Sequence, residues 1–569
     1  MDNATIAQAM NDIALLLEIK GENPFKIRSY SNAGQTIEKM STPIAVLVRE
    51  NRLRDIEGIG DALEKKITEL VTTGELEYLN ELRGQYPKTI LDLLKVDGLG
   101  PKSVKALYKA LGIGSLDDLR QACEAGEVRE VQGFSAKREQ KILAALAFLE
   151  KQGGKFRLNT AWVTAAALCA YLVDNSPATR VEVAGSLRRF KETVKDIDII
   201  AAADNTDEVM KAFLGWPEVA RVVSSGPTKS AVVLKNGIPV DVRVVAPNQF
   251  PYALLHFTGS KEHNVVLRRR AAEQNLKLNE YGLFREDDTS LQCDNETEIY
   301  QALGLPFLPP ELREGLYETD LCPPIQLVTQ NDLLGMAHCH STWSDGKNSI
   351  AEMADATREL GYHYLVITDH SQSSVYVNGL TPERVLEQHA EIDALNESAD
   401  TGFRVLKGIE SDILADGSLD YDSDMLRQFA FVIASVHSNF DMTEAEATKR
   451  IIRAIENPFT SAVGHLTGRL LLTRAGYTVN VDKVVDAAVA NGVAFEINAN
   501  PRRLDMDWRH LRRAAEKGAR FVIGPDAHRV AGLRNMRYGI GIARKGALAP
   551  EHVLNCLGVE EFLQWRKGR

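Results

Sequence analysis

The C-terminal part of the chain alternates between short apolar runs and stretches in which apolar residues recur at helical spacing. Seven of these runs have the length and composition of buried strands, and they cover residues 336–340, 364–370, 403–410, 429–437, 461–465, 493–500 and 520–528. Strands that alternate with helices form parallel sheets. The pattern therefore predicts a parallel barrel whose chemistry lies at the carboxyl ends of its strands.

Six of the seven runs end in a residue that can bind a metal ion, and only the sixth, with Glu496-Ile497-Asn498 near its end, lacks an obvious ligand. The candidate ligands are His338, His340, Asp345, His370, Glu410, His437, His465, Asp526 and His528. They are too many for one ion, and histidine with carboxylate suits Zn²⁺, Mn²⁺ or iron. The set predicts a centre of two or three metals, a type used most often on phosphate esters. The alternative is that these histidines are ordinary core residues, but that interpretation does not explain why six of them lie at strand ends.

Two segments in the first third of the chain share the pattern apolar-x-Gly-apolar-Gly followed by helical periodicity. The glycines are Gly58 and Gly60 in the first segment and Gly98 and Gly100 in the second. Such glycines allow a tight turn, after which the N–H groups at a helix start can bind an anion. Four lysines follow the turns, as phosphate contact requires: Lys65, Lys66, Lys102 and Lys105. The pattern predicts two helix-hairpin-helix clamps on DNA, with a degenerate third that has Ser135 in place of its second glycine; ordinary turns are the alternative.

Three aspartates lie on two predicted strands in the middle of the chain. Asp196 and Asp198 are two residues apart, so both carboxylates face one side, and the other face is expected to bury Ile197, Ile199 and Ile200. Asp241 lies in a second apolar strand. Carboxylates this close repel unless a cation lies between them, so neighbouring strands would hold two Mg²⁺ ions. A short segment before these aspartates is suited to a polyphosphate. Gly185 and Ser186 form a small turn there, and Arg188 and Arg189 supply positive charge.

The composition of the chain limits which classes of partner and which cellular compartment we expect. A formal net charge of −11 excludes a uniformly basic coat but not a local basic groove. The six cysteines form no Cys-x-x-Cys pair, which fits reduced thiols, and Cys339 should face away from the histidines beside it. We expect no signal peptide, and the most apolar run, Ala161 to Val173, is too short to span a bilayer. The expected location is the cytoplasm, in association with the nucleoid.

The motifs around the candidate ligands resemble those of the polymerase-and-histidinol-phosphatase (PHP) domain. They are His338-Cys339-His340, Thr368-Asp369-His370, Gly408-Ile409-Glu410, Ser435-Val436-His437, Gly464-His465 and Pro525-Asp526-Ala527-His528. The resemblance implies a distorted (β/α)7 barrel and a site for up to three ions, Mn²⁺ and/or Zn²⁺. Leu466 and Pro525 depart from the family's motifs, but neither is a ligand.

The order of motifs from residue 1 to 315 resembles the X family of DNA polymerases. The hairpin clamps are followed by Gly-Ser-x-Arg-Arg, Asp-x-Asp, a lone aspartate and Phe-Thr-Gly-Ser at 257–260. The resemblance implies that Asp196, Asp198 and Asp241 bind Mg²⁺ or Mn²⁺ and that Asp241 acts on the primer 3′-hydroxyl. It also implies nucleotide and template contacts: Gly185, Ser186 and Arg189 at the phosphates, Phe257 and Gly259 at the sugar, Asn264 at the base and Arg268 at the template strand.

Two departures leave family properties open. His256 stands where the family often has tyrosine beside Phe257, which puts discrimination against ribonucleotides in question, although an ordinary histidine is the alternative. Lys66 matches the lysine with which some members open an abasic sugar, and Lys26 lies near the position that binds a 5′-phosphate. Another basic position of that pocket is Ala62, so 5′-phosphate binding without lyase activity is the alternative.

The chain is thus expected to be multidomain, combining α+β and α/β parts. The expected parts are a helical lyase-like domain at 1–80, a fingers-like helical domain at 81–150, a nucleotidyltransferase-type palm at 151–245, a thumb at 246–315, a linker at 316–331 and a PHP barrel at 332–569.

The two resemblances predict a DNA-directed DNA polymerase that fills short gaps in repair and carries a metal-dependent 3′→5′ exonuclease or 3′-end-processing activity. Cleavage at abasic sites would be an analogy alone. The expected partners are dNTPs and gapped or nicked DNA with a 5′-phosphate; no membrane is expected, and the chain is expected to be monomeric. The alternatives are a barrel that acts as a phosphatase on small molecules, or a scaffold that binds DNA ends, which intact aspartates and ligands disfavour.

Overall fold

The computed structural model describes residues 3–40, 43–56, 58–316, 326–398 and 402–567. It divides into two compact units, Met1–Gly153 and Gly154–Arg569. Most of the predicted linker, including Pro323 and Pro324, lies outside the described residues. None of the helices among the described residues is long and apolar enough to cross a membrane.

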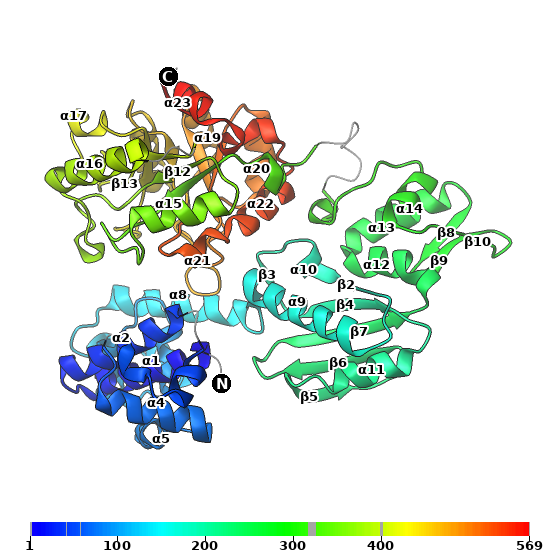
Figure 1. The fold of residues 1–569 in the computed structure, drawn as a ribbon, viewed down its shortest axis with the longest axis horizontal. Helices are drawn as coiled ribbons and strands as arrows, with labels where there is room; N and C mark the ends of the chain where they lie inside the picture. The colour runs from blue at the N-terminus through cyan, green and yellow to red at the C-terminus, as the bar shows by residue number, and fades with distance from the viewer. Residues whose placement is uncertain (1–2, 41–42, 57, 317–325, 399–401, 568–569) are drawn as a thin grey trace. The chain divides into compact units, whose positions relative to one another are not determined.

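The first unit is built from helices around one apolar core (Figure 1). Its helices are α1 (Asn3–Lys20), α2 (Pro24–Lys39), α3 (Ile44–Arg49), α4 (Asp61–Thr73), α5 (Glu77–Gly84), α6 (Pro101–Leu111), α7 (Leu116–Glu124) and α8 (Ala136–Gln152). The helical periodicity after each glycine pair marks buried faces, since Ile67 and Leu70 in α4 and Val104 and Leu107 in α6 belong to the core.

The second unit begins with a five-stranded sheet in the order β2-β4-β7-β6-β5. The strands are β2 (Arg180–Val183), β4 (Ile197–Ala202), β5 (Val219–Ser224), β6 (Lys229–Leu234) and β7 (Pro239–Val245). The central pair β4 and β7 is parallel, and the other pairs are antiparallel. Helices α9 (Leu158–Asn175) and α11 (Thr206–Leu214) pack on one face, and α12 (Phe250–Thr258) packs on the other.

The burial of β4 corrects one detail of the predicted strand. Ile197 and Ile199 belong to the core that includes α9, as expected. Ile200, however, packs with Phe250 and Ala253 of α12 on the opposite face. Side chains alternate along a strand, so Ile200 faces the same side as Asp198. Apolar packing against α12 therefore begins directly beside the predicted carboxylate site.

A smaller region follows the sheet and has its own three strands in the order β10-β9-β8. Its elements are α13 (Lys261–Ala272), β8 (Leu276–Asn279), β9 (Gly282–Arg285), β10 (Ser290–Leu291) and α14 (Glu296–Ala302). Arg313 is completely buried there and pairs with Glu296, their Nη1 and Oε1 atoms lying 2.6 Å apart. A buried charge needs such a partner, so this pair connects the end of the region to α14.

Seven strands in the C-terminal part form one parallel sheet, in which the spatial order equals the chain order. They are β11 (Gly335–Cys339), β12 (Tyr364–Ile367), β13 (Arg404–Asp412), β14 (Phe431–Ser435), β15 (Ala462–Val463), β16 (Ala494–Asn498) and β17 (Phe521–Gly524). The ring closes through Ala527: its carbonyl accepts a hydrogen bond from the N–H of His340 at 2.9 Å. The predicted seven-stranded barrel is confirmed.

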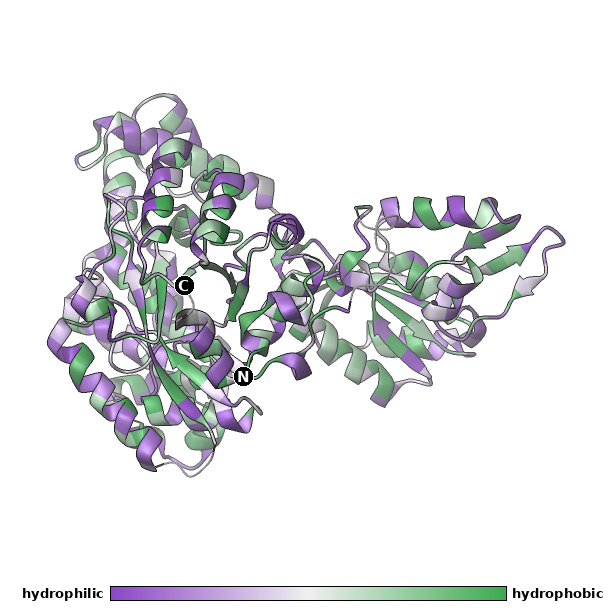
Figure 2. Ribbon diagram, turned by 90° about the horizontal axis from the view of Figure 1, so that it is seen from above, coloured by the Kyte–Doolittle hydropathy of each residue, from purple (hydrophilic) through white to green (hydrophobic). Residues whose placement is uncertain are grey.

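Helices surround this barrel, and hydrophobic residues concentrate on its strands and on the helix faces turned toward them (Figure 2). The principal helices are α15 (Ile350–Glu359), α16 (Pro382–Ser398), α18 (Glu444–Ile455), α19 (Val481–Asn491), α20 (Trp508–Glu516), α22 (Met536–Lys545) and α23 (Val559–Lys567). A separate apolar cluster, which includes Val366, Phe431 and Val522, fills the interior together with Phe562 of α23. The amino-terminal end of the barrel is therefore packed, and polar side chains occupy the carboxyl end.

Candidate functional site

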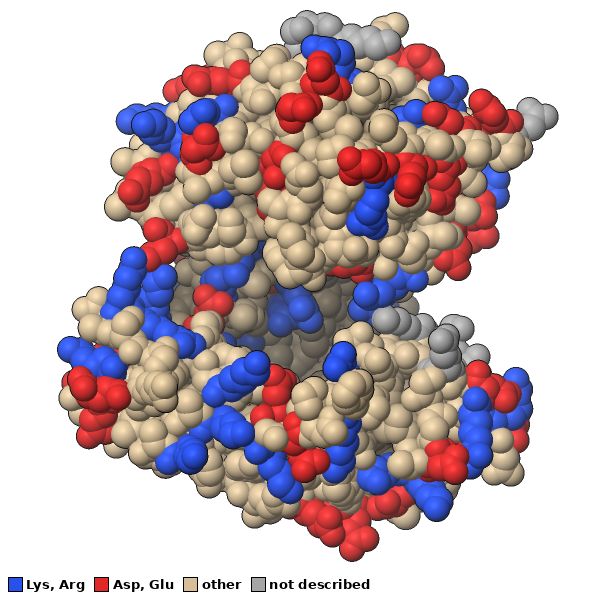
Figure 3. Space-filling view, turned by 90° about the vertical axis from the view of Figure 1, so that its left-hand side faces the viewer, with Lys and Arg blue, Asp and Glu red and all other residues tan. Residues whose placement is uncertain are grey.

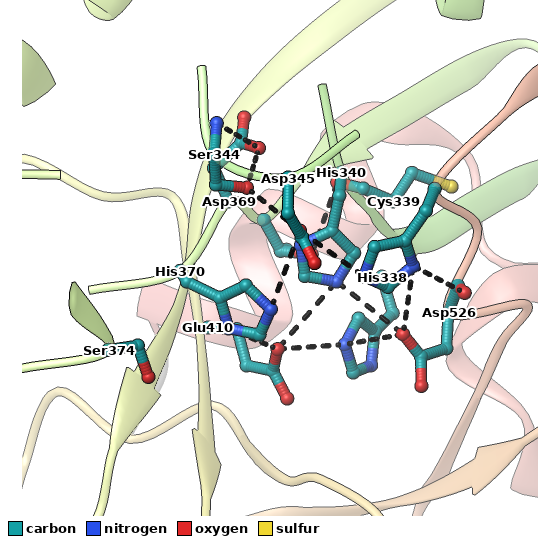
Figure 4. A network of polar contacts seen from close by, with 12 residues as sticks. His338, Cys339, His340, Ser344, Asp345, Asp369, His370, Ser374, Glu410 and Asp526 are labelled. Atoms are coloured by element: carbon teal, nitrogen blue, oxygen red, sulfur yellow. Dashed lines mark hydrogen bonds and ion pairs between the residues drawn. The ribbon is translucent and has the colours of Figure 1, made fainter. Parts of the chain in front are cut away.

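All nine side chains predicted as barrel ligands lie together at the carboxyl ends of the strands. Figure 4 labels six of them: His338, His340, Asp345, His370, Glu410 and Asp526. Eight of the nine form three overlapping groups whose donor atoms lie within 4.8 Å of one another: His340 with Asp345, His370 and His528; His338 with His340 and Asp526; and His370 with Glu410 and His437. The ninth, His465, places Nε2 3.0 Å from Glu410 Oε1. Overlap between groups is the arrangement that a centre with several bridged ions requires.

Glu410 occupies the middle of this cluster. Its Oε2 lies 3.4 Å from His338 Nε2, 3.6 Å from His340 Nε2 and 3.1 Å from His370 Nδ1. Its Oε1 lies 3.2 Å from His437 Nε2. The two oxygens of one fully buried carboxylate thus face different histidines, so Glu410 can bridge two ions.

Several ring nitrogens in the cluster lack a hydrogen-bond partner among the described residues. They are His338 Nε2, both nitrogens of His340, His370 Nδ1 and His465 Nδ1, and all are buried. A buried polar atom without a partner is costly, and a metal ion bound to the nitrogen removes that cost. The donor set, imidazole with carboxylate, fits Zn²⁺ or Mn²⁺. Cys339 is buried in the surrounding apolar core and its sulfur points away from the cluster, as predicted.

Two further carboxylates orient the histidines, and sequence reasoning missed both. Glu496, on the strand with no predicted ligand, contacts His338 Nδ1 and is fully buried. Asp412 Oδ1 lies 2.5 Å from His437 Nδ1. Such outer partners fix the ring and tautomer of a ligating histidine. The one available signal was for Asp412, which lies two residues after Glu410 and therefore on the same face of β13.

The charges in the cluster are strongly coupled. Burial lowers the pKa of His370 to about 3. Burial also opposes the charge of His437 and of His528, but Glu410 raises the pKa of His437 to about 10, and Asp345 raises that of His528 to about 9. A metal ion binds only the deprotonated ring nitrogen. Loading the centre therefore releases protons, and metal affinity falls as the pH is lowered.

Glu496→Gln is expected to lower the metal affinity of the barrel about 10- to 100-fold, because it weakens the contact that orients His338. Elemental analysis after dialysis against a graded chelator measures the retained metal. Glu359→Gln, at an exposed position of α15, is the control for loss of one negative charge. Equal metal retention in the Glu496→Gln variant and the control would show that Glu496 has no orienting role.

The three palm aspartates also come together. Asp198 of β4 is paired in register with Asp241 of the parallel strand β7, and Asp196 directly precedes β4. Burial and then the other two carboxylates raise the pKa of Asp198 to about 6; burial and then Asp241 raise that of Asp196. Lys229 Nζ lies 2.9 Å from Asp241 Oδ2. A group of mutually repelling carboxylates at this spacing fits a divalent metal site.

The turn at Gly185 lies against this carboxylate group. Gly185 has φ +62°, and a Cβ there would lie 2.1 Å from Asp198 Oδ2, so only glycine fits. Ser186 follows in the same short helix, α10 (Gly185–Arg188). The motif Gly-Ser thus brings the start of this helix next to the predicted metal ligands.

The two arginines after the turn are not free cations in this structure. Arg188 is held by both carboxylate oxygens of Glu296, at 3.0 and 2.7 Å. Arg189 Nε lies 3.1 Å from Glu314 Oε1, and Lys545 of the barrel helix α22 lies 2.7 Å from the same oxygen. Burial lowers the pKa of Lys545 to about 8. Arg189 would have to exchange Glu314 for a phosphate in order to take the predicted role.

The residues predicted to contact sugar, base and template lie around one turn. Phe257, in the last turn of α12, lies beneath the guanidinium of Arg243, which is 4.2 Å from the ring centroid. Gly259 comes directly after the helix, at φ +68°. Asn264 in α13 donates from Nδ2 to the carbonyl of His256 at 2.7 Å. The Nε of Arg268 donates to the Asn264 carbonyl at 3.2 Å. Burial lowers the pKa of His256, so its ring is neutral at physiological pH.

The first unit contains three copies of one turn, not two and a remnant. Gly58, Gly98 and Gly133 have φ +87°, +85° and +92°. Gly60, Gly100 and Ser135 then cap α4, α6 and α8 in extended backbone conformations. Ser135 does not disturb the third turn, because its φ of −130° suits any residue and its hydroxyl accepts from the N–H of Arg138.

Lys102, Lys65 and Lys105 are exposed beside the first two turns. Acidic and basic side chains are otherwise interspersed over the face shown in Figure 3, in keeping with the negative net charge. Lys26 and Lys66 converge on the ring of Tyr78, at 5.6 and 4.8 Å from its centroid. Two lysines on one aromatic ring form a local positive site of the kind that a phosphate group can bind.

Gly98→Ala is expected to destabilise the first unit by about 1–2 kcal/mol, because its left-handed backbone is unfavourable for a residue with a Cβ. Gly100→Ala is the matched control: Gly100 has φ −93°, and a Cβ there would meet nothing within 4 Å. Chemical denaturation followed by circular dichroism measures the difference. Equal stability of the two variants would contradict the assigned turn.

Four stretches of the chain match described protein families. Residues 1–76 match "Helix-hairpin-helix domain", and residues 90–147 match "SAM-like Helix-hairpin-helix tandem", which spans the second and third turns. Residues 253–314 match "DNA polymerase beta thumb", and residues 337–500 match "PHP domain".

Similar proteins cover the chain in whole or in part. "DNA polymerase/3'-5' exonuclease PolX" of Bacillus subtilis (strain 168) is 40% identical over 571 residues, 99% of this chain and 100% of that protein. Human "DNA-directed DNA/RNA polymerase mu" is 26% identical and covers 55% of this chain and 69% of its own length. A "Probable phosphatase" of Thermoanaerobacter sp. (strain X514) is 26% identical and covers 42% of this chain and 95% of its own length.

Proposed function

The chain belongs to the family X DNA polymerases that carry a PHP domain, and on this premise we propose that it fills short gaps in DNA and trims 3′ ends at a second site. The observation that carries the first activity is the register of Asp198 against Asp241, with Asp196 beside them. Two-metal nucleotidyl transfer requires carboxylates at this spacing. We assign the three aspartates to Mg²⁺ or Mn²⁺.

In this proposal the chain's own residues position the reactants. Asp241 orients the primer 3′-hydroxyl, and Ser186 with the N–H groups at the start of α10 holds the triphosphate. Arg189 joins them when a phosphate displaces Glu314. Phe257 and Gly259 bound the sugar, Asn264 the base, and Arg268 the template. The metal ions, when bound, supply charge neutralisation along the phosphates.

The second activity is carried by the geometry of Glu410, whose two oxygens face different histidines within three overlapping ligand groups. We propose that the barrel binds Mn²⁺ and/or Zn²⁺, up to three ions, and hydrolyses the terminal phosphodiester of a DNA strand. Asp345 and His528, whose side chains are 28% and 33% exposed, form the open edge where the substrate enters. Metal ions at such a site activate water and neutralise the phosphate.

DNA binding completes the proposal. The helix-hairpin-helix turns hold the sugar-phosphate backbone without reading bases, since their exposed N–H groups and lysines contact phosphates. Lys26 and Lys66 take the 5′-phosphate of a gap; lyase activity of Lys66 stays a separate prediction. We propose a monomer that acts on gapped or nicked DNA, and such a substrate places it at the nucleoid in the cytoplasm.

A single-nucleotide-gap duplex with a 5′-phosphate and a labelled primer tests both activities, in Mn²⁺ with and without dNTPs. Extension should be lost in Asp198→Ala alone, and primer shortening in His340→Ala alone. This result would establish two independent sites. If neither reaction occurs although the duplex is bound, the chain is a scaffold for DNA ends.

The resemblance of the barrel to proteins named as probable phosphatases supports one alternative, hydrolysis of small phosphate monoesters. Nitrophenyl phosphate separates the two functions. Turnover of this ester without any shortening of DNA ends would favour the alternative, and the reverse would favour the nuclease.

A further inference from the structure

The loop between β12 and α16 exposes two large apolar side chains. Val375 is 79% exposed and Tyr376 is 75% exposed, and among the other large apolar residues described only Phe25, at 76%, is as exposed as Tyr376. Exposed aromatic surface of this extent has an unfavourable contact with water. Two neighbouring side chains of this kind offer a contact surface to a ligand or partner.

The loop is rigid although its tip is exposed. Residues 375–377 form a 3-10 turn in which the Val377 N–H donates to the Ser374 carbonyl at 3.1 Å. Asn378 donates from Nδ2 to the Trp343 carbonyl at 3.0 Å. A Cβ at Gly379 would lie 2.0 Å from the Ser371 carbonyl oxygen, so the base of the loop is closely packed. The aromatic ring is therefore presented from a fixed backbone.

The same loop is fastened to the metal centre. Ser373 and Ser374 donate to the Asp412 carboxylate at 2.6 and 3.0 Å, and Asp412 in turn holds His437. Figure 4 shows Ser374 beside His370 and Glu410. Tyr376 lies two residues beyond Ser374. Burial raises the pKa of Tyr376, a hydrogen bond with Ser374 lowers it, and the carboxylates of Asp412, Glu410 and Asp345 raise it. Tyr376 is thus an exposed residue of a loop whose base contacts the centre.

The open side of the centre lies at two of its candidate ligands. Asp345 and His528 are the most exposed of the candidate ligands, whereas the side chain of His437 is 9% exposed and that of Glu410 1%. Asp345 is also one of the carboxylates that act on the Tyr376 hydroxyl. Asn378, two residues beyond Tyr376, donates to the carbonyls of Trp343 and Ser344, so the loop is joined to the segment that carries Asp345.

We propose that Tyr376 is a positioning residue on which the 3′-terminal base of a single-stranded DNA end stacks, so that the last phosphodiester lies over the metal centre. The inference rests on the proposed nuclease function and adds the chemistry that selects its substrate. Stacking of a base on an aromatic ring is sequence-tolerant, because every base has a π face. A small phosphate ester without a base gains nothing from it.

The test compares Tyr376→Ala and Tyr376→Phe with the full-length protein in Mn²⁺. The substrates are two 5′-labelled oligonucleotides that differ only in whether the 3′-terminal nucleotide carries a base. On the normal end we expect Tyr376→Ala to reduce kcat/KM about 5- to 100-fold, mainly through KM, and Tyr376→Phe to restore it to within about twofold of the unsubstituted protein. On the abasic end the Ala variant and the unsubstituted protein should have the same kcat/KM, because no base is present to stack. Leu386→Ala, which removes another exposed apolar side chain of the barrel, is the matched control.

Two results would overturn the inference alone: equal shortening of the normal end by the Ala variant and the unsubstituted protein, or an equal loss on both substrates, which would indicate a general effect on the centre. Failure of the unsubstituted protein to shorten either oligonucleotide would overturn the nuclease function, and this inference with it. Primer extension by all variants reports that the palm is intact.

Discussion

Asp198→Asn is expected to reduce primer extension on the order of 10³-fold or more and, in the absence of metal, to raise the melting temperature of the protein. The loss of activity follows from removal of a negative charge in the centre of the carboxylate group. The gain in stability follows from the raised pKa of Asp198, about 6, which shows that its ionised form is unfavourable in the folded state without a cation.

Ionisation of Asp198 makes the stability of the metal-free protein depend on pH. The pKa of Asp198 is higher in the folded protein than its usual value of 3.8, so ionisation of Asp198 disfavours the folded state. This penalty is absent below about pH 4, grows between about pH 4 and 6, and is complete above about pH 6. The amide in the Asp198→Asn variant cannot ionise, and the variant should therefore melt a few degrees higher at about pH 8 in EDTA.

Differential scanning fluorimetry at about pH 8, with EDTA and with Mg²⁺, checks the stability effect. The unsubstituted protein should gain stability from Mg²⁺, and the variant should gain much less. Asp204→Asn is the control, since Asp204 is exposed after the same strand. Primer extension by the unsubstituted protein should also decline as the pH falls through about 6, because protons compete with metal. A variant that melts lower than the unsubstituted protein in EDTA would refute the repulsive carboxylate group.

The barrel could be predicted because its pattern is local. Interior residues of a strand alternate with exterior ones, and the ligands continue that alternation past the strand end: in β14, for example, Phe431 and Ile433 lead to Ser435 and His437. The same regularity places Asp196 and Asp198 on one face. Ligand chemistry at successive strand ends is therefore visible without knowledge of tertiary contacts.

The supporting residues could not be predicted in the same way. Glu496 contacts a histidine 158 positions earlier in the chain, and only the closed ring of strands brings the two together. The guanidinium of Arg189 contacts Glu314, which is 125 positions away in the chain, and its carbonyl accepts from Lys545, which is 356 positions away. No local sequence pattern indicates contacts between residues this far apart. The third hairpin turn was predicted to be degenerate because the motif has glycine at the position of Ser135. The backbone there is extended, a conformation that serine adopts as easily as glycine.

Glu410→Gln is expected to reduce the shortening of DNA ends on the order of 10³-fold or more, with primer extension unchanged. The glutamine side chain has nearly the same volume as glutamate, so the fully buried position remains filled. Its amide, however, carries no charge, and only one of its two terminal atoms can coordinate a metal ion. A bridge between two ions is thereby lost, together with the negative charge that faces His338, His340, His370, His437 and His465.

The Asp412→Asn variant distinguishes a carboxylate that bridges two ions from one that only orients a histidine. Asp412 contacts His437 but belongs to none of the three ligand groups, so its amide variant should lose only about 10- to 100-fold in metal affinity. Glu410→Gln should instead lower the number of ions retained per chain, as measured by elemental analysis, and excess Mn²⁺ should restore activity to the Asp412→Asn variant but not to the Glu410→Gln variant. Rescue of both variants to the same extent would mean that Glu410 orients histidines and does not bridge. A centre built around a bridging carboxylate requires the opposite result, because added metal cannot replace the missing oxygen.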